Sequence, residues 1–280
     1  MLLLVDLDGV VYRGADPVPG VAALLAERAA AGDDVVYVTN NSMHYRADYV
    51  TRLSAMGAPV SADRVVSSPR ATALYLRDNE PGIRRVLTVG ASGLDRELRD
   101  VGLEIVGAAQ VAERMAKEGL DGWAAAGHPD AVIVGLDQQL TYLRVAAAAD
   151  CIRAGARFIA TNRDPTYPTE RGIRPGAGSV VAAVANTTGV EPLVIGKPEP
   201  LLLIEAARAV GADPRDAVMI GDGLATDIAA ARAVGARSVL MLTGVSSRAD
   251  AEALPAELRP TAFAADAGEL ARVLAELASG

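Results

Sequence analysis

Several residue types are scarce in this chain of 280 residues, and each scarcity narrows what the protein can be. A single cysteine, Cys151, excludes an internal disulfide and favours a reducing environment. Two histidines and one cysteine are too few for a structural zinc site. No uncharged apolar run reaches the length of about 18 residues that a membrane-spanning helix needs. The apolar residues before Asp6 are too few for a signal peptide, so we expect a cytoplasmic protein without a membrane partner.

Basic residues are in the minority, and almost all of them are arginines. The chain has 27 basic and 35 acidic residues, and its net charge of −8 at pH 7 argues against a nucleic-acid partner. Only Lys117 and Lys197 are lysines. In a chain that uses arginine for most positive charges, a lysine at 197 suggests a place that needs a compact point charge instead of a planar fork.

The first predicted strand, at 2–11, begins with four apolar residues, which lead directly into two carboxylates, Asp6 and Asp8, and then into Gly9. Four successive apolar residues predict a strand that is buried on both faces of a parallel sheet. Ligands of such sheets bind beyond the carboxyl ends of the strands. Two carboxylates at that place can hold a divalent cation, and one of them can attack an electrophile. The alternative is a solvated turn, because aspartate is common in turns.

A second predicted strand, at 35–38, runs into Thr39, Asn40 and Asn41. Their hydroxyl, amide and backbone groups are well placed to bind an anion. Asn41 or Ser42 would also serve as the N-cap of a following helix, and both roles are compatible.

Two later strands end in charged residues as well. The strand at 193–195 is followed by Lys197, and the strand at 217–220 is followed by Asp222 and Asp227. Asp227 would also serve as a helix cap, whereas Asp222 lies between two glycines and is harder to explain in that way. Strands of one parallel sheet point their carboxyl ends in the same direction, so these groups can converge. Acids for a cation, donors for an anion and one lysine predict a phosphate site with a hard cation.

Strand and helix patterns alternate along the chain, with one clear interruption. Residues 79–82, Asn-Glu-Pro-Gly, form a polar, turn-rich break, and the alternation then resumes as a separate unit. We therefore expect an α/β core made of residues 1–80 and 191–280, with an α/β domain of residues 81–190 inserted into it. The segment 162–178 contains three prolines and three glycines, and we expect it to be a structured functional loop.

Four segments resemble the motifs of the haloacid dehalogenase superfamily. They are Asp-Leu-Asp-Gly-Val at 6–10, Thr-Asn-Asn-Ser at 39–42, Gly-Lys-Pro at 196–198 and Gly-Asp-Gly-Leu-Ala-Thr-Asp at 221–227. The long insert, with Ala-Thr-Asn-Arg-Asp-Pro at 160–165, resembles the branch with an α/β cap, subfamily IIA, which includes phosphatases of nitrophenyl, pyridoxal and glycerol phosphates. The resemblance covers essentially the whole chain. It implies a Rossmann-like parallel-sheet core with an inserted α/β cap.

The resemblance also implies a magnesium-dependent phosphatase that acts on a small phosphorylated metabolite through an aspartyl-phosphate intermediate. Asp6 would be the nucleophile. Asp8 would protonate the leaving alcohol and then deprotonate the attacking water. Mg²⁺ would be bound by Asp6, Asp222 and the backbone carbonyl of Asp8.

The remaining motif residues would surround the transferring phosphoryl group. Thr39, Asn40, Asn41 and Lys197 would bind its oxygens, because a carboxylate can attack a phosphate dianion only after the negative charge is neutralised. Asp227 would orient Lys197 or a metal-bound water. These roles are implied by the resemblance, residue by residue.

The segment from Asp164 to Pro168 carries an aromatic ring, Tyr167, between two prolines that restrict the backbone. A rigid loop costs little entropy to order, so it suits a surface that meets a ligand repeatedly. By the resemblance, Tyr167 lies at the mouth of the site and contacts the leaving group. The alternative is that this loop supports a contact between caps, and we expect a homodimer formed through the cap.

Other phosphate and nucleotide motifs are missing or incomplete. The sequence has no Walker-type loop and no Gly-x-Ser-x-Gly elbow. Gly176-Ala-Gly178 has Val181 where a dinucleotide-binding motif needs its third glycine, and we expect no strand before it. The alternative from another class is a non-catalytic sensor of phosphate ligands on the same fold. The filled catalytic positions favour the enzyme.

Overall fold

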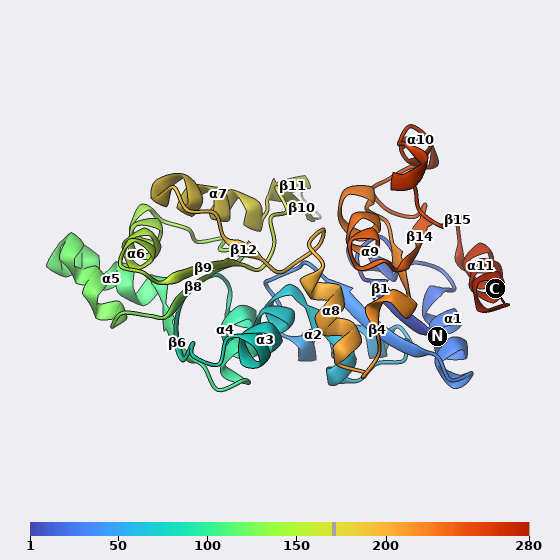
Figure 1. Cartoon of the computed structure of the whole chain (residues 1–280), viewed down its shortest axis with the longest axis horizontal. Coiled ribbons are helices and arrows are strands. Elements are labelled where there is room, and N and C mark those ends of the chain that lie inside the picture. Colours follow the sequence, from blue (N-terminus) through green and yellow to red (C-terminus); the bar gives the residue numbers. More distant parts are fainter. Residues whose placement is uncertain (170–171, 280) are drawn as a thin grey trace. The chain divides into compact units, whose positions relative to one another are not determined.

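The computed structural model describes residues 1–169 and 172–279, and the chain divides into two compact units (Figure 1). The first unit comprises residues 1–39, 46–67 and the chain from Lys197 onward. The second unit comprises residues 40–45 and 68–196. The assignment of a catalytic core to 1–80 and 191–280 and of a cap to 81–190 stays a prediction.

The first unit contains a six-stranded parallel sheet in the order β15-β14-β13-β1-β4-β5. The strand expected at 2–11 is β1, which is shorter than expected because it ends at Asp6, and it lies between β13 and β4. All five residues of β1 are buried, as an apolar run in a doubly covered sheet requires. The strands are β1 (Leu2–Asp6), β4 (Asp34–Thr39), β5 (Val65–Ser67), β13 (Ala217–Gly221), β14 (Arg237–Met241) and β15 (Ala262–Ala264).

Helices cover both faces of this sheet. On one face Leu3 and Val5 of β1 pack in a core with Leu25, Leu53 and Leu274, which come from α1, α2 and α11. On the other face α8 contacts β1, β4 and β5, and α9 contacts β14. Fully burying a leucine side chain contributes roughly 1.5–3 kcal/mol, so these residues fix the helices against the strands. The helices are α1 (Val21–Ala30), α2 (Arg46–Ala55), α8 (Leu201–Arg208), α9 (Ala229–Val234), α10 (Arg248–Glu252) and α11 (Ala267–Ser279).

The second unit contains a five-stranded parallel sheet in the order β12-β9-β8-β6-β7. Helices α6 and α7 lie on one side of it, and α3 and α4 lie on the other (Figure 1). The elements are α3 (Ser68–Asn79), β6 (Arg85–Val89), α4 (Ser92–Arg99), β7 (Glu104–Gly107), α5 (Ala108–Glu118), β8 (Ala131–Val134), α6 (Tyr142–Arg153), β9 (Arg157–Ala160), α7 (Ala177–Thr188) and β12 (Leu193–Val194). None of the helices that the structure describes is long and apolar enough to cross a membrane.

The segment 162–178 was expected to be a loop, and this expectation was partly wrong. It contains an antiparallel hairpin of β10 (Thr166–Thr169) and β11 (Gly172–Pro175), and α7 begins at Ala177. Prolines are tolerated in such a hairpin because its outer edges need no backbone donor. The expectation that no strand precedes Gly176 was also wrong, since β11 ends at Pro175.

Helix α7 was not expected from the sequence. Its valines and threonines are β-branched, which lowers the helix propensity of the segment. Burial of Val180, Val181 and Val184 in the core of the second unit outweighs that preference.

Candidate active site

Three carboxylates meet at the carboxyl ends of β1 and β13 in the first unit. One oxygen each of Asp6, Asp222 and Asp227 lies within 4.8 Å of the other two, and all three residues are buried. Asp6 ends β1, and Asp222 directly follows the neighbouring strand β13. Lys197 donates hydrogen bonds from its Nζ to Oδ1 of Asp6 and to Oδ1 of Asp227, both at 2.5 Å. The structure thus brings together four charged residues that the sequence predicted to converge.

Two glycines make room for the carboxylate of Asp222. A Cβ atom on Gly9 or on Gly244 would clash with the Asp222 side chain. Gly9 also has a φ of 81°, which side-chain-bearing residues rarely adopt. The backbones of the turn after β1 and of the turn after β14 therefore lie so close to the Asp222 side chain that neither Gly9 nor Gly244 has room for a side chain.

Asp227 holds the site in place with both of its carboxylate oxygens. Its Oδ2 accepts hydrogen bonds from the backbone N–H groups of Asp222 (3.2 Å) and Gly223 (3.0 Å), while Oδ1 accepts the bond from Lys197. With 1% of its surface exposed, Asp227 is the most buried of the three acids. This geometry suits a residue that orients Lys197, and that role stays a prediction.

The surroundings of the cluster alter the protonation of Asp6 and Asp222. Burial raises the pKa of Asp6 well above its ordinary value, Lys197 opposes this, and the charges of Asp227 and Asp222 add to it. Burial and the charge of Asp227 raise the pKa of Asp222 to about 6. Desolvation lowers the pKa of Lys197, but Asp227 and Asp6 together raise it above its ordinary value. One ammonium group thus faces three carboxylates, and the cluster carries an excess of negative charge.

This donor set fits a hard divalent cation. Mg²⁺ prefers oxygen ligands, and the cluster offers carboxylate oxygens from Asp6 at the end of β1 and from Asp222 and Asp227, which follow the adjacent strand β13. Burial and the neighbouring carboxylates raise the pKa values of Asp6 and Asp222, and a bound cation would compensate the negative charge of those neighbours. The residues therefore fit the predicted magnesium site.

Asp8 lies in the turn after β1 and is exposed. The turn is closed by a hydrogen bond of 2.7 Å from the Gly9 N–H to the Tyr12 carbonyl. The guanidinium carbon of Arg52 stands 3.4 Å from the centre of the Tyr12 ring. Partial desolvation raises the pKa of Asp8, while the charge of Arg52 and hydrogen bonds from the Gly14 and Gly9 N–H groups lower it. A raised pKa favours the protonated form that a general acid needs.

A segment that the sequence reasoning missed, 243–246, supports both aspartate-bearing turns. Thr243 donates a hydrogen bond of 2.6 Å from its Oγ1 to the Gly9 carbonyl, next to Asp8. The Val245 N–H donates to Oδ2 of Asp222 at 2.8 Å, and the Ser246 N–H donates to the Asp222 carbonyl at 3.1 Å. The signal was present, because Thr-Gly-Val-Ser follows an apolar strand, as the polar residues of the other motifs do.

Thr39 is the last residue of β4 and is buried in the first unit. Asn40 is the first residue of the second unit and is also buried. Its Nδ2 donates to both carboxylate oxygens of Asp164, at 3.0 and 3.1 Å, and its carbonyl accepts hydrogen bonds from Ser68 and Asn162. Asp164 therefore fixes the amide plane of Asn40, and phosphate binding by Thr39 and Asn40 stays a prediction.

The side chain of Asn41 is exposed, and its Oδ1 accepts a hydrogen bond of 2.9 Å from the Met43 N–H. This is a local turn and not the helix N-cap that the sequence left open for Asn41, because α2 begins only at Arg46. Ser42 is buried, and its Oγ accepts a hydrogen bond from the Leu136 N–H at 2.9 Å. The contribution of Asn41 to phosphate binding stays a prediction.

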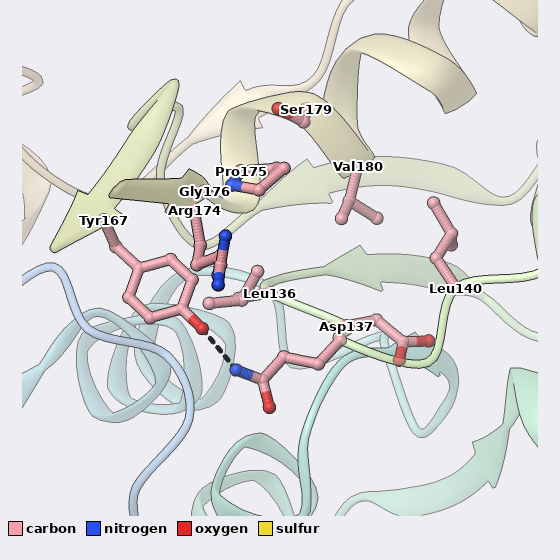
Figure 2. Close-up of a pocket in the computed structure, with 10 residues that line it drawn as sticks. Leu136, Asp137, Leu140, Tyr167, Arg174, Pro175, Gly176, Ser179 and Val180 are labelled. Atoms are coloured by element: carbon pink, nitrogen blue, oxygen red, sulfur yellow. Dashed lines mark hydrogen bonds between the residues drawn. The ribbon is translucent and has the colours of Figure 1, made fainter. Parts of the chain in front are cut away.

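Tyr167 lines a pocket of about 780 Å³ that lies within the second unit (Figure 2). Its hydroxyl accepts a hydrogen bond from Nε2 of Gln138. The β10–β11 pairing sets Tyr167 opposite Arg174, and both side chains reach the same pocket. The other lining residues come from the loop after β8 and from the start of α7: Leu136, Asp137, Gln138, Leu140, Pro175, Gly176, Ser179 and Val180.

Comparisons with known proteins agree with this site and fold. The haloacid dehalogenase-like hydrolase family matches residues 3–104, and a related HAD-hydrolase-like family matches residues 194–270. An acid sugar phosphatase of Staphylococcus aureus is 36% identical over 249 residues, which are 89% of each chain.

Solved structures extend the likeness over nearly the whole chain. A p-nitrophenyl phosphatase from Archaeoglobus fulgidus has a TM-score of 0.84 at 29% identity and covers 97% of this chain and 98% of its own. A glycerol phosphate phosphatase from Mycobacterium tuberculosis, in complex with magnesium, has a TM-score of 0.81 at 37% identity and covers 96% of this chain and 75% of its own.

The chain therefore belongs to the haloacid dehalogenase-like hydrolases. Within that family it is an enzyme of the phosphatase type, like the relatives it matches. The family, the fold class and the enzyme class predicted from the sequence are confirmed.

Proposed function

We propose that this chain is a magnesium-dependent phosphatase that hydrolyses a small phosphomonoester through an aspartyl-phosphate intermediate. The observation that carries the proposal is the buried cluster of Asp6, Asp222 and Asp227 with Lys197 between two of the carboxylates. The proteins it resembles are named as an acid sugar phosphatase, a p-nitrophenyl phosphatase and a glycerol phosphate phosphatase, which supports a small phosphorylated substrate.

Negative charge must be neutralised before a carboxylate can attack a phosphate dianion. Lys197 supplies one positive charge at the nucleophile, since its Nζ lies 2.5 Å from Oδ1 of Asp6. Mg²⁺ held by Asp6, Asp222 and the backbone carbonyl of Asp8 would supply further charge neutralisation at the phosphoryl oxygens. Thr39, Asn40 and Asn41 are proposed to donate hydrogen bonds to those oxygens.

Asp6 and Asp8 divide the chemistry between them. A carboxylate oxygen of Asp6 attacks phosphorus as the bond to the leaving oxygen breaks, and protonated Asp8 gives its proton to that oxygen. Asp8, now a carboxylate, accepts a proton from a water molecule that attacks the aspartyl-phosphate. This second step releases inorganic phosphate and restores both aspartates. The raised pKa of Asp8 supports its first role, and its exposure supports contact with water.

The inserted residues 81–190 are proposed to form a cap that chooses the leaving group, with Tyr167 as one contact. We further propose that the protein is a cytoplasmic homodimer formed through the cap. The single, buried Cys151 is consistent with a reducing compartment.

Turnover of p-nitrophenyl phosphate with and without Mg²⁺ tests the proposal. We expect phosphate release with Mg²⁺ and its loss when a chelator is added. Thermal stabilisation by phosphate or beryllium fluoride should also require Mg²⁺, because the carboxylate cluster repels an anion without it. A protein that binds phosphate in the presence of Mg²⁺ but releases none from any phosphomonoester in a broad panel would instead be the non-catalytic sensor.

A further inference from the structure

The pocket lined by Tyr167 differs in charge from the protein as a whole, because its unpaired charge among the described residues is positive. Of the ten lining residues that the structure describes, only Asp137 and Arg174 carry full charges. The protein as a whole has a net charge of −8, so a negatively charged pocket would be the ordinary expectation. The partners of these two residues decide the sign of the charge in the pocket.

The carboxylate of Asp137 is already neutralised. Nη1 of Arg144 lies 2.9 Å from its Oδ1 and 2.8 Å from its Oδ2. The Gln139 N–H also donates to Oδ1 at 2.8 Å. Asp137 is 8% exposed, so its ion pair with Arg144 is largely shielded from water. The negative charge of Asp137 is therefore compensated by Arg144.

Arg174, in contrast, forms no ion pair or hydrogen bond through its side chain with any residue in 1–169 or 172–279. Its guanidinium group is directed into the pocket beside the Tyr167 ring and close to Leu136 (Figure 2). An arginine fork of this kind matches the geometry of a carboxylate or a phosphate group.

The first turn of α7 adds a second positive feature. Gly176, which precedes the helix, and Ser179 and Val180 within its first turn all line the pocket. The N-terminus of a 12-residue helix carries partial positive charge, and no acidic residue in the first turn of α7 offsets it. Two independent features of the same pocket thus favour negative charge.

We propose that this pocket binds the carboxylate or phosphate group of a small polar molecule through Arg174, with Tyr167 and Gln138 beside it. Leu136, Leu140 and Val180 supply an apolar wall for a short carbon chain. The anionic group belongs either to the leaving group of the substrate, in which case the inference rests on the proposed function, or to a separate ligand. In both cases the guanidinium of Arg174 would bind the anionic group in the same way.

A matched pair of substrates tests the first source. In 2-phosphoglycolate the leaving group ends in a carboxylate, and in 2-hydroxyethyl phosphate it ends in a hydroxyl group of similar size. Arg174→Gln should lower kcat/KM for 2-phosphoglycolate by about 10-fold or more, because a charge-assisted hydrogen bond is lost. It should change kcat/KM for 2-hydroxyethyl phosphate by less than about 2-fold, because that leaving group carries no anionic group for Arg174 to bind.

A calorimetric titration with malonate tests the pocket without any turnover. Malonate carries two carboxylates and no phosphoryl group. Arg174→Gln should weaken its binding by about 10-fold. The control is Arg84→Gln, which removes an exposed arginine of the same unit that does not line the pocket, and it should leave both measurements unchanged. A changed malonate affinity with an unchanged substrate preference would identify a separate ligand as the source.

The inference is overturned if Arg174→Gln alters neither the malonate affinity nor the preference for 2-phosphoglycolate. It is also overturned if Arg84→Gln has the same effect, because the change would then follow net charge and not the pocket. Failure of the wild-type protein to hydrolyse p-nitrophenyl phosphate would reject the proposed function instead. The malonate titration would still decide whether the pocket binds an anion.

Discussion

The two units of the chain share one plan, a parallel sheet with helices on both faces, but the unpaired charges at their candidate sites, in the part of the chain that the structure describes, differ in sign. In the first unit β1 and β13 end at buried carboxylates, and Asp6 and Asp222 are each 7% exposed. In the second unit the loop after β8 brings Asp137, which Arg144 neutralises, and the charge left in the pocket belongs to Arg174.

The difference shows how one architecture serves two kinds of ligand. An excess of carboxylates with one lysine attracts a cation and tolerates a phosphate only beside it. In the second unit the carboxylate is paired, and a guanidinium without a partner among the described residues attracts an anion directly. The fold therefore gives the place of each site, and the side chains gathered there give its chemistry. Substitutions in one unit should accordingly affect different properties from those in the other.

The largest contrast is expected between Asp6→Asn and Asp137→Asn. Asp6→Asn removes the proposed nucleophile and should reduce turnover to below about 1% of wild type while the fold survives. Asp137→Asn leaves the charge of Arg144 uncompensated, so it should lower the free energy of unfolding by about 1–3 kcal/mol. Activity towards p-nitrophenyl phosphate should persist in Asp137→Asn. Steady-state kinetics and thermal unfolding of both variants measure the contrast, and substantial turnover by Asp6→Asn would reject the covalent mechanism.

The two lysines provide the next comparison. Lys197→Arg should lower kcat by about 100-fold, because a planar guanidinium cannot occupy the place of an ammonium group that is 2.5 Å from both Asp6 and Asp227. Lys117→Arg makes the same change in the last turn of α5 in the second unit and should leave kcat unchanged. Near-normal kcat in Lys197→Arg would place that lysine outside the chemistry.

The carboxylate cluster should also make stability depend on pH. The raised pKa of Asp222, about 6, means that the folded protein holds this proton more tightly than the unfolded chain does. The stabilisation is therefore complete below the ordinary pKa of about 4 and is lost as the pH rises through about 6, by roughly 1–3 kcal/mol. Four carboxyl groups have lowered pKa values, and the stability that they contribute is lost only as the pH falls through those lower values: Asp63, Asp130, Asp213 and Asp250.

Thermal unfolding with a chelator, from about pH 4.5 to about pH 7, measures this effect. The Tm should fall over that range in the wild type and fall less in Asp222→Asn. Added Mg²⁺ should raise the Tm most at the higher pH, where the carboxylates are ionised. Parallel curves for the two proteins would contradict the assigned pKa shift.

Much of the site was predictable because it follows strand ends. Lys197 lies 191 residues from Asp6 along the chain, yet a buried parallel sheet brings such residues to one edge. The contact between Asn40 and Asp164 was not predictable, because it depends on how a loop folds back over 124 residues. The β10–β11 hairpin was missed because prolines and glycines predict a loop, and α7 was missed because its valines favour a strand.

Thr243 was missed although it follows an apolar strand, and a substitution there tests whether backbone support of the Asp8 turn affects catalysis. Thr243→Val removes the hydroxyl that donates to the Gly9 carbonyl at 2.6 Å and keeps the shape of the side chain. The turn that carries Asp8 should loosen, and kcat should fall about 10-fold with little change in KM. Thr243→Ser should restore activity. Thr51→Val, which removes a hydroxyl from a hydrogen bond within α2, should not affect kcat. A loss of Tm without a loss of kcat would make Thr243 a structural residue only.

The smallest effect is expected at Tyr167, because it acts on the choice of substrate and not on the chemistry. Tyr167 has a flat ring and a hydroxyl that Gln138 orients, so it can pack on a leaving group or hydrogen-bond to it. Tyr167→Ala should lower kcat/KM about 10-fold, or about 1.4 kcal/mol, for the best substrate in a phosphomonoester panel. p-Nitrophenyl phosphate should be affected much less, because its own leaving group is activated.

Two further variants separate specificity from assembly. Tyr167→Phe keeps the ring, so it shows how much of the effect depends on the hydroxyl. Tyr142→Ala removes a tyrosine of the same unit that is 80% exposed and lies outside the pocket, and it should alter neither substrate. Equal losses for both substrates in Tyr167→Ala would reject the role in specificity. Dissociation of an oligomer on a sizing column, with kcat/KM unchanged, would instead make this hairpin a contact between caps. Because Tyr167 and Arg174 are paired across the hairpin, the same assays on both variants show whether they recognise one ligand or two.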